Sequence, residues 1–224
     1  LSPYLARIEQ FLTAPTADKI GNIELTSEED RRSPKVNKLI SILDEHFAAV
    51  AAGTIKGKVL IFTQYKASAE AVYNSLPPKY KEMCIHYTAG RKAECGVQFK
   101  NDDRKQIMVG VETSMNTGLN LQFCVRLIRM ENCWTPGNFE QGSSRINRPN
   151  VKQGEFRKYI YYNWIIVDQS IDVTKCSYLI SKILSKARFD EDDERYRKLK
   201  AKPFKMTLDN ILDTKLNTVE ELQT

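Results

Sequence analysis

The feature that most constrains this fold is a repeated alternation of short, apolar runs with stretches that have helical spacing. The apolar runs are bounded by polar turns and predict strands at 58–63, 83–87, 106–111, 125–130 and 159–167. Helical stretches are expected over about 66–76, 91–100 and 137–146, followed by a closing helix from Ile171 to Leu184. Such alternation implies right-handed crossovers and an open, mainly parallel sheet with helices on both faces, so the predicted fold class is α/β.

One further helix has clear start and stop signals. Ser33 is a good N-cap residue, Pro34 suits the first helical position, and Gly53 is placed to end the helix. The apolar positions between them keep helical spacing: Val36, Leu39, Ile40, Leu43, Phe47 and Val50. Pro77 and Pro78 are expected to close the helix over 66–76.

The chain is divided into three parts by composition. Residues 1–32 have no sustained period and include a charged run, so we interpret them as a linker or surface excursion. Residues 33–187 form the main domain, and 188–224 form a charged, peripheral helical tail. Because the chain begins at Leu1 and not at a methionine, we expect it to be a piece of a longer protein.

Composition limits the cellular locations and the kinds of binding partner that the chain is expected to have. The apolar runs are far shorter than the roughly 20 residues that cross a bilayer, so we expect no membrane segment and an intracellular location, in cytoplasm or nucleus. Five widely separated cysteines and two histidines favour neither a zinc site nor a disulfide framework. The net charge of +6 fits a polyanionic partner such as nucleic acid.

Polar residues follow the predicted strands. In an open parallel sheet, ligands bind beyond the carboxyl ends of the strands, so these residues are the candidates for a site. They are Thr63-Gln64, Tyr87-Thr88, Glu112-Thr113-Ser114, the stretch up to Asn120, and Glu131 to Trp134. The alternative is that loops are polar in any protein. We expect Trp134 to pack in the core, and Lys58, Lys66 and Lys152 to be ordinary solvated lysines.

The segment from Gln141 to Pro149 is the most informative. Arg145 and Arg148 lie three residues apart, so on a helix that Pro149 stops they would point the same way. Two guanidiniums on one face suit phosphate oxygens, which predicts a phosphate site. The alternative is that both arginines only complement the negative end of the helix dipole.

Together these segments resemble the second RecA-like lobe of superfamily 2 helicases, most closely the Swi/Snf-type double-stranded DNA translocases, over roughly 33–187. Ser33-Pro34-Lys35-Val36 and the run from Lys58 to Tyr65 are similar to the entry helix and motif IV. Gly118-Leu119-Asn120-Leu121 is similar to the end of motif V. Trp134-Thr135-Pro136, with Gln141, Arg145 and Arg148, is similar to motif VI.

The chain also departs from this family. Ser114-Met115-Asn116 stands where the translocases have Ala-Gly-Gly, and Asn147 replaces a histidine. Glu112 replaces a threonine and puts a carboxylate near an expected phosphate contact, so Thr113 or Ser114 is expected to make that contact. The stretch from 90 to 106 is short, so we expect a divergent member from a virus or mobile element.

The resemblance implies a role for each candidate residue. Arg145 and Arg148 would be arginine fingers, with Gln141 coupling them to neighbouring motifs. Gly118 and Asn120 would contact the nucleotide, while Gln64, Thr88, Thr113 and Ser114 would hold phosphates of nucleic acid, duplex DNA by family likeness. The sequence lacks the G-x-x-x-x-G-K-[ST] loop, so ATP and Mg²⁺ would be bound mainly by an N-terminal RecA-like lobe of the parent protein, and this lobe alone would be inactive.

Two other functions remain open on the sequence. A non-catalytic nucleic-acid-binding module could keep the surface of the lobe without its motor partner. An unrelated doubly wound domain, such as a small-molecule transferase, could use the two arginines to grip a substrate phosphate and would not depend on nucleic acid.

Overall fold

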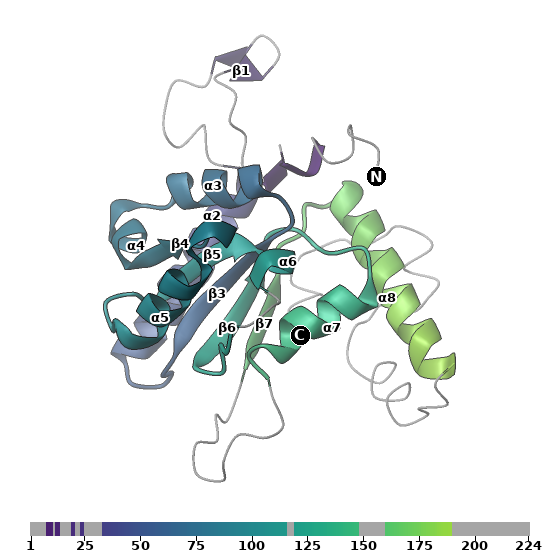
Figure 1. Ribbon diagram of the computed structural model, residues 1–224. Helices are drawn as coiled ribbons and strands as arrows, with labels where there is room; N and C mark the ends of the chain where they lie inside the picture. Colours follow the sequence, from purple (N-terminus) through teal and green to yellow (C-terminus); the bar gives the residue numbers. More distant parts are fainter. Residues whose placement is uncertain are drawn as a thin grey trace.

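A computed structural model describes residues 8–10, 12–13, 19–20, 23–24, 33–115, 119–147 and 160–189. Its centre is a five-stranded sheet in the order β4-β5-β3-β6-β7, and every described pairing in it is parallel. The strands are β3 (Lys58–Thr63), β4 (Cys84–His86), β5 (Ile107–Val111), β6 (Cys124–Arg129) and β7 (Tyr161–Trp164). The predicted open parallel sheet is confirmed (Figure 1).

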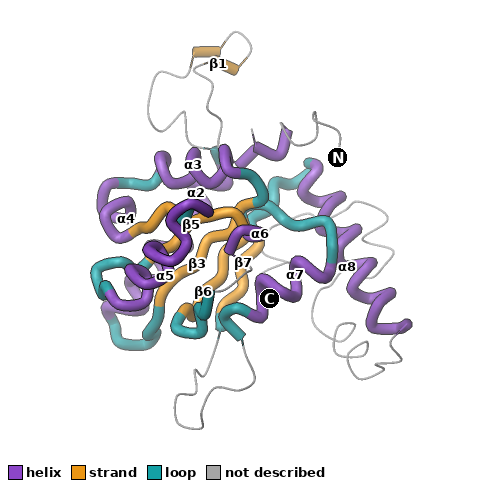
Figure 2. The backbone as a smooth tube through the Cα atoms, in the orientation of Figure 1, coloured by secondary structure: helices purple, strands orange, loops and turns teal. Residues whose placement is uncertain are grey.

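Helices cover both faces of the sheet (Figure 2). One face packs against α2 (Pro34–Ala51), α3 (Lys66–Ser75) and α4 (Pro78–Met83). The other face packs against α5 (Lys92–Asn101) and α6 (Glu112–Met115). The pleat of β3 divides its side chains accordingly: Val59 and Ile61 join the first core, and Leu60 and Phe62 the second. The remaining helices, α7 (Pro136–Ser144) and α8 (Ile171–Phe189), lie side by side near β7.

The start of α2 follows the sequence signals. The Ser33 hydroxyl accepts a hydrogen bond from the Val36 amide at 3.1 Å, and Pro34 occupies the first turn. The helix ends at Ala51, and Gly53 follows with a φ of 71°, a conformation that favours glycine. The predicted helix from the Ser33 cap is therefore confirmed.

Some short elements were not predicted. The pair Pro77-Pro78 ends α3, as expected, but Pro78 also begins α4, because proline is well tolerated in the first turn of a helix. The segment after β5 forms the single turn of α6 where the sequence indicated a polar loop. The strands β1 (Lys19–Ile20) and β2 (Ile23–Glu24) pair antiparallel, and η1 (Ala89–Arg91) precedes α5.

Lys58 is not a solvated lysine, and that prediction was wrong. Its side chain is buried, and its Nζ donates hydrogen bonds to the carbonyl oxygens of Phe99 at 2.6 Å and Asp102 at 3.0 Å. The ammonium also lies 5.4 Å from the centre of the Phe99 ring. Lys66 is exposed, as predicted, and Lys152 lies outside the described residues.

Strand β6 carries two buried arginines, Arg126 and Arg129. Arg126 donates hydrogen bonds to Asn163 of β7 at 3.1 Å and to Glu45 of α2 at 3.0 Å. Its neighbour His46 is buried, and burial, assisted by the charge of Arg126, lowers the pKa of His46 to about 4. All five cysteines are buried free thiols. None of the helices in the described part of the chain is long and apolar enough to cross a membrane.

Candidate functional site

The carboxyl ends of the parallel strands gather the candidate residues at one edge of the sheet. Gln64 follows β3, Thr88 lies two residues after β4, Thr113 lies in α6 directly after β5, and Gln141 and Arg145 follow β6 on and after α7. Because the strands are parallel, these segments leave the sheet on the same side (Figure 2). The polar edge expected from the sequence is present in the described residues.

Two of the loops at this edge are tied together. The Tyr87 hydroxyl donates a hydrogen bond to the Ser114 carbonyl oxygen at 3.1 Å, which joins the loop after β4 to α6. Thr88 and Thr113 are exposed, and Ser114 is half-buried. Thr88 and Ser114 therefore stand in two segments that this hydrogen bond joins, and Thr113 precedes Ser114 in the second.

Gln64 is oriented differently. Its side-chain Nε2 donates a hydrogen bond to Glu112 Oε2 at 2.9 Å, and its backbone amide donates to Glu131 Oε2 at 2.7 Å. The side chain is half-buried and is directed toward α6. Its predicted contact with nucleic acid stays a prediction, but in this arrangement its amide group links β3 to α6.

Glu112 is fully buried and does not place an open carboxylate beside a phosphate, in contrast to the sequence expectation. Its Oε1 forms an ion pair with Arg129 Nη2 at 2.7 Å, and both side chains have an exposed fraction of 0%. The same Nη2 donates to the Phe139 carbonyl oxygen at 3.1 Å and to Ser143 Oγ at 3.2 Å. We call Glu112 and Arg129 the central pair. The charge introduced at position 112 is thus neutralised within the protein.

The close approach of α7 to the central pair depends on Gly142. A Cβ atom added at Gly142 would overlap Glu112 Oε1 and lie 3.0 Å from Arg129 Nη2. The guanidinium carbon of Arg129 also lies 4.3 Å from the centre of the Phe139 ring on the same helix. Helix α7 is therefore seated directly on the pair.

Arg145 follows the last helical residue of α7. The helix ends at Ser144, earlier than expected, and Arg145 is its half-buried C-cap with helical φ and ψ of −64° and −34°. The turn is held because Ile146 is buried in the core and the Asn147 side chain hydrogen-bonds the Tyr162 hydroxyl of β7. Arg148 lies outside the described residues, so the shared face of the two arginines stays a prediction.

The other predicted nucleotide contacts are partly described. Asn120 is exposed, and its Oδ1 accepts a hydrogen bond from the Gln122 amide at 3.3 Å. Gly118 lies outside the described residues. Gln141 is exposed on α7. Within the described ranges, no three or more His, Cys, Asp and Glu side chains gather in a way that could hold a metal ion.

Trp134 packs against α8 and does not enter the core clusters, so the prediction that it packs in the core is not met. Its ring meets Tyr178 edge-on, with ring centres 6.3 Å apart, and Lys175 Nζ lies 5.0 Å from the Trp134 ring. The side chain is half-buried. This contact holds α8 beside the segment that leads into α7.

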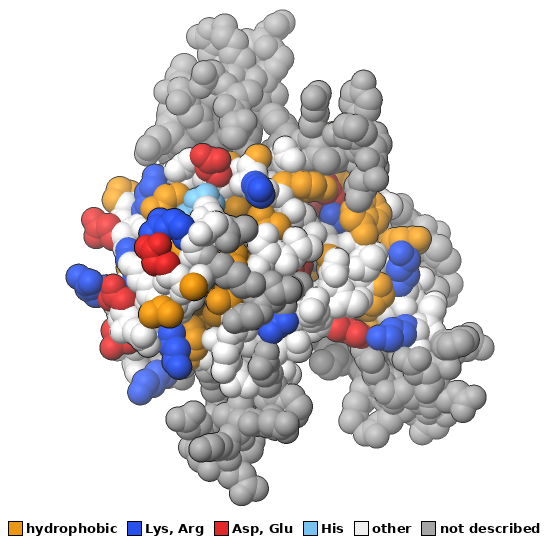
Figure 3. All heavy atoms as spheres, in the orientation of Figure 1, with side chains coloured by type: hydrophobic (Ala, Val, Ile, Leu, Met, Phe, Trp, Pro, Cys, Tyr) orange, Lys and Arg blue, Asp and Glu red, His pale blue; other side chains and the backbone are white. Residues whose placement is uncertain are grey.

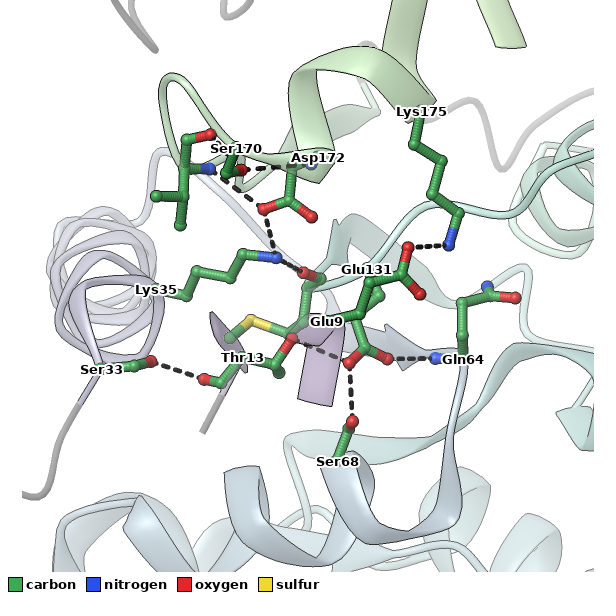
Figure 4. Close-up of polar contacts among 12 residues, drawn as sticks. Glu9, Thr13, Ser33, Lys35, Gln64, Ser68, Glu131, Ser170, Asp172 and Lys175 are labelled. Atoms are coloured by element: carbon green, nitrogen blue, oxygen red, sulfur yellow. Dashed lines mark hydrogen bonds and ion pairs between the residues drawn. The ribbon is translucent and has the colours of Figure 1, made fainter. Parts of the chain in front are cut away.

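A second buried ionic group joins the N-terminal segment, residues 8–10 and 12–13, to this edge (Figure 4). We call it the N-terminal cluster; its charged members are Glu9, Lys35, Glu131, Asp172 and Lys175, all buried. Lys175 Nζ pairs with Glu9 Oε1 at 2.7 Å, and Lys35 Nζ pairs with Asp172 Oδ2 at 2.7 Å. Three segments far apart in sequence therefore meet at the ends of β3 and β6.

Hydrogen bonds connect the N-terminal cluster to the loop after β3. Glu9 accepts a hydrogen bond from the Tyr65 hydroxyl at 2.6 Å, which adds to burial in raising the pKa of Tyr65. Glu131 accepts hydrogen bonds from the hydroxyls of Thr13 at 2.8 Å and Ser68 at 2.6 Å. Burial raises the pKa of Glu131, although these donors oppose the change.

The sequence interpretation missed both the central pair and the N-terminal cluster. The domain boundaries stay a prediction, but Glu9 and Thr13 are buried against the lobe although residues 1–32 were interpreted as a linker. One available signal was the presence of Arg126 and Arg129 in an otherwise apolar strand, because a buried arginine requires partners. The identity of the partners was not readable from local pattern.

Exposed charges of both signs are mixed on the face drawn in Figure 3. Lys and Arg side chains alternate there with Asp and Glu and do not form a single basic patch. The net charge of +6 is therefore not concentrated on the described residues of that face.

Comparisons with known proteins agree with this arrangement. Residues 34–150, somewhat more than half of the chain, match the family described as the helicase conserved C-terminal domain. The fold is similar to a crystal structure of the C-terminal part of the Fun30 ATPase domain, with a TM-score of 0.55 and 17% sequence identity. The likeness covers 71% of this chain and 48% of that chain, so this chain spans about half the length of that structure. Among curated proteins, none matches this chain in sequence. The predicted RecA-like α/β fold is confirmed.

Proposed function

This chain belongs to the helicase conserved C-terminal domain family, and from that premise we propose that it is the C-terminal motor lobe of an ATP-dependent nucleic-acid translocase or helicase. Its partners would be nucleic acid and the N-terminal RecA-like lobe of the same parent protein. The lobe would be inactive alone, because the resemblance assigns the phosphate-cradling loop to the other lobe. A viral or mobile-element origin and an intracellular location remain predictions.

The observation that carries this proposal is the link between α6 and α7. The central pair holds the helix that leads to Arg145 against the helix that carries Thr113 and Ser114. A motor lobe needs such an arrangement, because the groups that meet the nucleotide and those that meet the nucleic acid must move together when the lobes close.

The side chains at the carboxyl edge of the sheet suit a bound nucleoside triphosphate. The candidate groups are a guanidinium at Arg145 and carboxamides at Gln141 and Asn120, which can donate hydrogen bonds to phosphate or sugar oxygens. The one carboxylate in the motif V segment, Glu112, is buried and ion-paired, so it does not oppose an anion. Gly118 would allow close approach of the backbone, and the first lobe would supply most contacts to ATP and Mg²⁺.

In this mechanism the residues of the lobe stabilise charge and hold position. Arg145 and Arg148 would donate hydrogen bonds to phosphate oxygens as the lobes close, which stabilises the charge that develops in phosphoryl transfer. Gln141 would couple that contact to the neighbouring segments. The bound Mg²⁺ would neutralise charge on the phosphates.

The nucleic-acid side is proposed for the exposed hydroxyls of Thr88 and Thr113, with Ser114 beside them. Gln64 is included by family resemblance, although its amide group faces Glu112. These groups suit contacts to backbone phosphates, which position the strand without reading its sequence. Duplex DNA as the track follows from the likeness to Swi/Snf-type translocases.

The test is arginine replacement in the full-length protein. Arg145→Ala and Arg148→Ala are each expected to lower nucleic-acid-stimulated ATP hydrolysis by about 10³-fold or more, which is the usual contribution of an arginine finger. Arg104→Ala is the matched control, because Arg104 lies before β5 at the opposite edge and is 89% exposed. Stimulation should be compared for duplex DNA, single-stranded DNA and RNA.

The outcomes separate the three functions. Retained stimulated hydrolysis in the Arg145 and Arg148 variants, with folding and binding unchanged, would reject the motor proposal. Nucleic-acid binding without any hydrolysis in the full-length protein would favour the non-catalytic module. Independence from nucleic acid altogether would favour an unrelated phosphate-binding enzyme.

A further inference from the structure

The central pair joins three segments of the candidate site. Glu112 lies at the start of α6 and accepts a hydrogen bond from Gln64 after β3 through Oε2. Arg129 ends β6 and bonds α7 at Phe139 and Ser143. From the end of β6, Arg129 thus links α6, through the ion pair, to α7, through hydrogen bonds.

We propose that Glu112 and Arg129 are positioning residues that fix the Arg145 end of α7 relative to the Thr113 and Ser114 surface of α6. This inference rests on the proposed motor function. The two residues do not touch the nucleotide or the nucleic acid in this scheme. They act through the segments that they hold.

Short covalent paths connect the pair to both contact surfaces. Thr113 is the residue after Glu112, and Arg145 is two residues after Ser143, which accepts a hydrogen bond from Arg129. A shift of the pair would therefore move both surfaces. A small misplacement of a group that acts on the transition state lowers the rate strongly, whereas it leaves ground-state binding less affected.

Stability alone does not account for the pair. Replacement of a buried ion pair by well-packed apolar residues is often neutral or stabilising, because the desolvation of two charges offsets their attraction. The pair is also fitted to its surroundings, because Gly142 is the residue of α7 that leaves room for Glu112 Oε1. An ion pair with fixed hydrogen-bond geometry sets the orientation of the segments that it joins, which apolar packing alone does not do.

The experiment uses the double variant Glu112→Gln/Arg129→Met in the full-length protein. This change removes both charges together, so neither charge is left buried without its partner. The readout is the ratio of ATP turnover with nucleic acid to turnover without it, together with the KM for ATP. The ratio does not depend on the fraction of molecules that are folded, so loss of stability alone does not change it.

Arg126→Met is the matched control. Arg126 is a buried arginine of the same strand, but its described partners Glu45 and Asn163 lie on α2 and β7. The double variant is expected to lower the stimulation ratio by about tenfold to a hundredfold with little change in KM. Arg126→Met is expected to leave the ratio as in the wild type.

Ser143→Ala provides a second variant in case the double variant does not fold. It removes one acceptor of Arg129 without changing any charge, and should lower the ratio in the same direction by a smaller factor. A wild-type ratio in the folded double variant, or in Ser143→Ala if the double variant is unfolded, would overturn the positioning role. A wild-type protein that no nucleic acid stimulates would instead reject the proposed function, and this inference with it.

Discussion

The two buried ionic groups of this lobe differ in what they connect. The central pair lies between the sheet and the helices α6 and α7, within the residues that match the helicase family. The N-terminal cluster joins that same region to segments on either side of it, through Glu9 before α2 and through Asp172 and Lys175 on α8. The central pair holds segments of the candidate site together, and the N-terminal cluster joins the flanking segments to that site.

The two groups also differ in whether their charged side chains can reach water without unfolding of the sheet. Arg129 ends a strand with neighbours on both sides, so its guanidinium is confined as long as the sheet is intact. Glu9 belongs to a segment outside the sheet, so we expect this segment to detach and hydrate the carboxylate more easily than the sheet unfolds. A charge that cannot reach water must keep its ion-pair partner in place. A charge that can reach water is solvated when its partner is removed, so the loss of that ion pair costs less free energy.

The largest expected effect comes from breaking the central pair on one side. Arg129→Met leaves Glu112 buried without its ion-pair partner, and should lower the free energy of unfolding by about 3 to 5 kcal/mol. The double variant Glu112→Gln/Arg129→Met should recover most of this loss. Denaturant unfolding of all three proteins measures the difference. Equal losses in the single and double variants would mean that Glu112 does not become an uncompensated buried charge when Arg129 is removed.

A smaller effect is expected from the corresponding change in the N-terminal cluster. Lys175→Met removes the cation that pairs with Glu9, but the N-terminal segment can release the carboxylate to water. We expect a loss of about 1 to 3 kcal/mol in the free energy of unfolding. Hydrogen exchange should show faster exchange in residues 8–10 and 12–13 than in β3. A loss as large as that of Arg129→Met, with no local opening, would contradict the contrast between the two groups.

The sheet could be predicted because its signals are local. The run over 58–63 agrees with β3 at both ends, since six consecutive buried positions between polar residues have few other interpretations. The single turn of α6 was missed because four residues are too few to show a helical period. The short helix α4 was missed because Pro78 was interpreted only as the end of a helix and not also as the start of the next.

The candidate site could be predicted only in part. Its position at the carboxyl edge could be predicted, because the alternation of strands and helices in the sequence indicates a parallel sheet, and ligands bind beyond the carboxyl ends of such strands. The pairing of Glu112 with Arg129 and of Glu9 with Lys175 joins residues 17 and 166 positions apart. Nothing in a single sequence specifies such distant pairs. Glu112 was therefore interpreted as a charge beside the site and not as a buried partner of β6.

The smallest expected effect concerns Glu131, whose described hydrogen-bond donors are all neutral, whereas Glu112 has the charged donor Arg129. Burial raises the pKa of Glu131 above its ordinary value of 4.5, so the folded state holds this proton more tightly than the unfolded state. Its contribution to stability is therefore greatest below pH 4.5 and is lost as the pH rises through the folded-state pKa. The loss amounts to about 1.4 kcal/mol for each pH unit that separates the folded-state pKa from the unfolded-state pKa.

Replacement of Glu131 by glutamine isolates this contribution. Glu131→Gln does not titrate at this position, so the unfolding free energy of the wild type should fall relative to that of the variant as the pH rises from 4.5 through the folded-state pKa. His46, whose pKa is lowered, has the opposite slope but is common to both proteins and cancels in the difference. Denaturant unfolding of both proteins across this pH range measures the difference. A difference that is constant with pH would show that the pKa of Glu131 is the same in the folded and unfolded states, so that its hydrogen-bond donors fully offset the effect of burial.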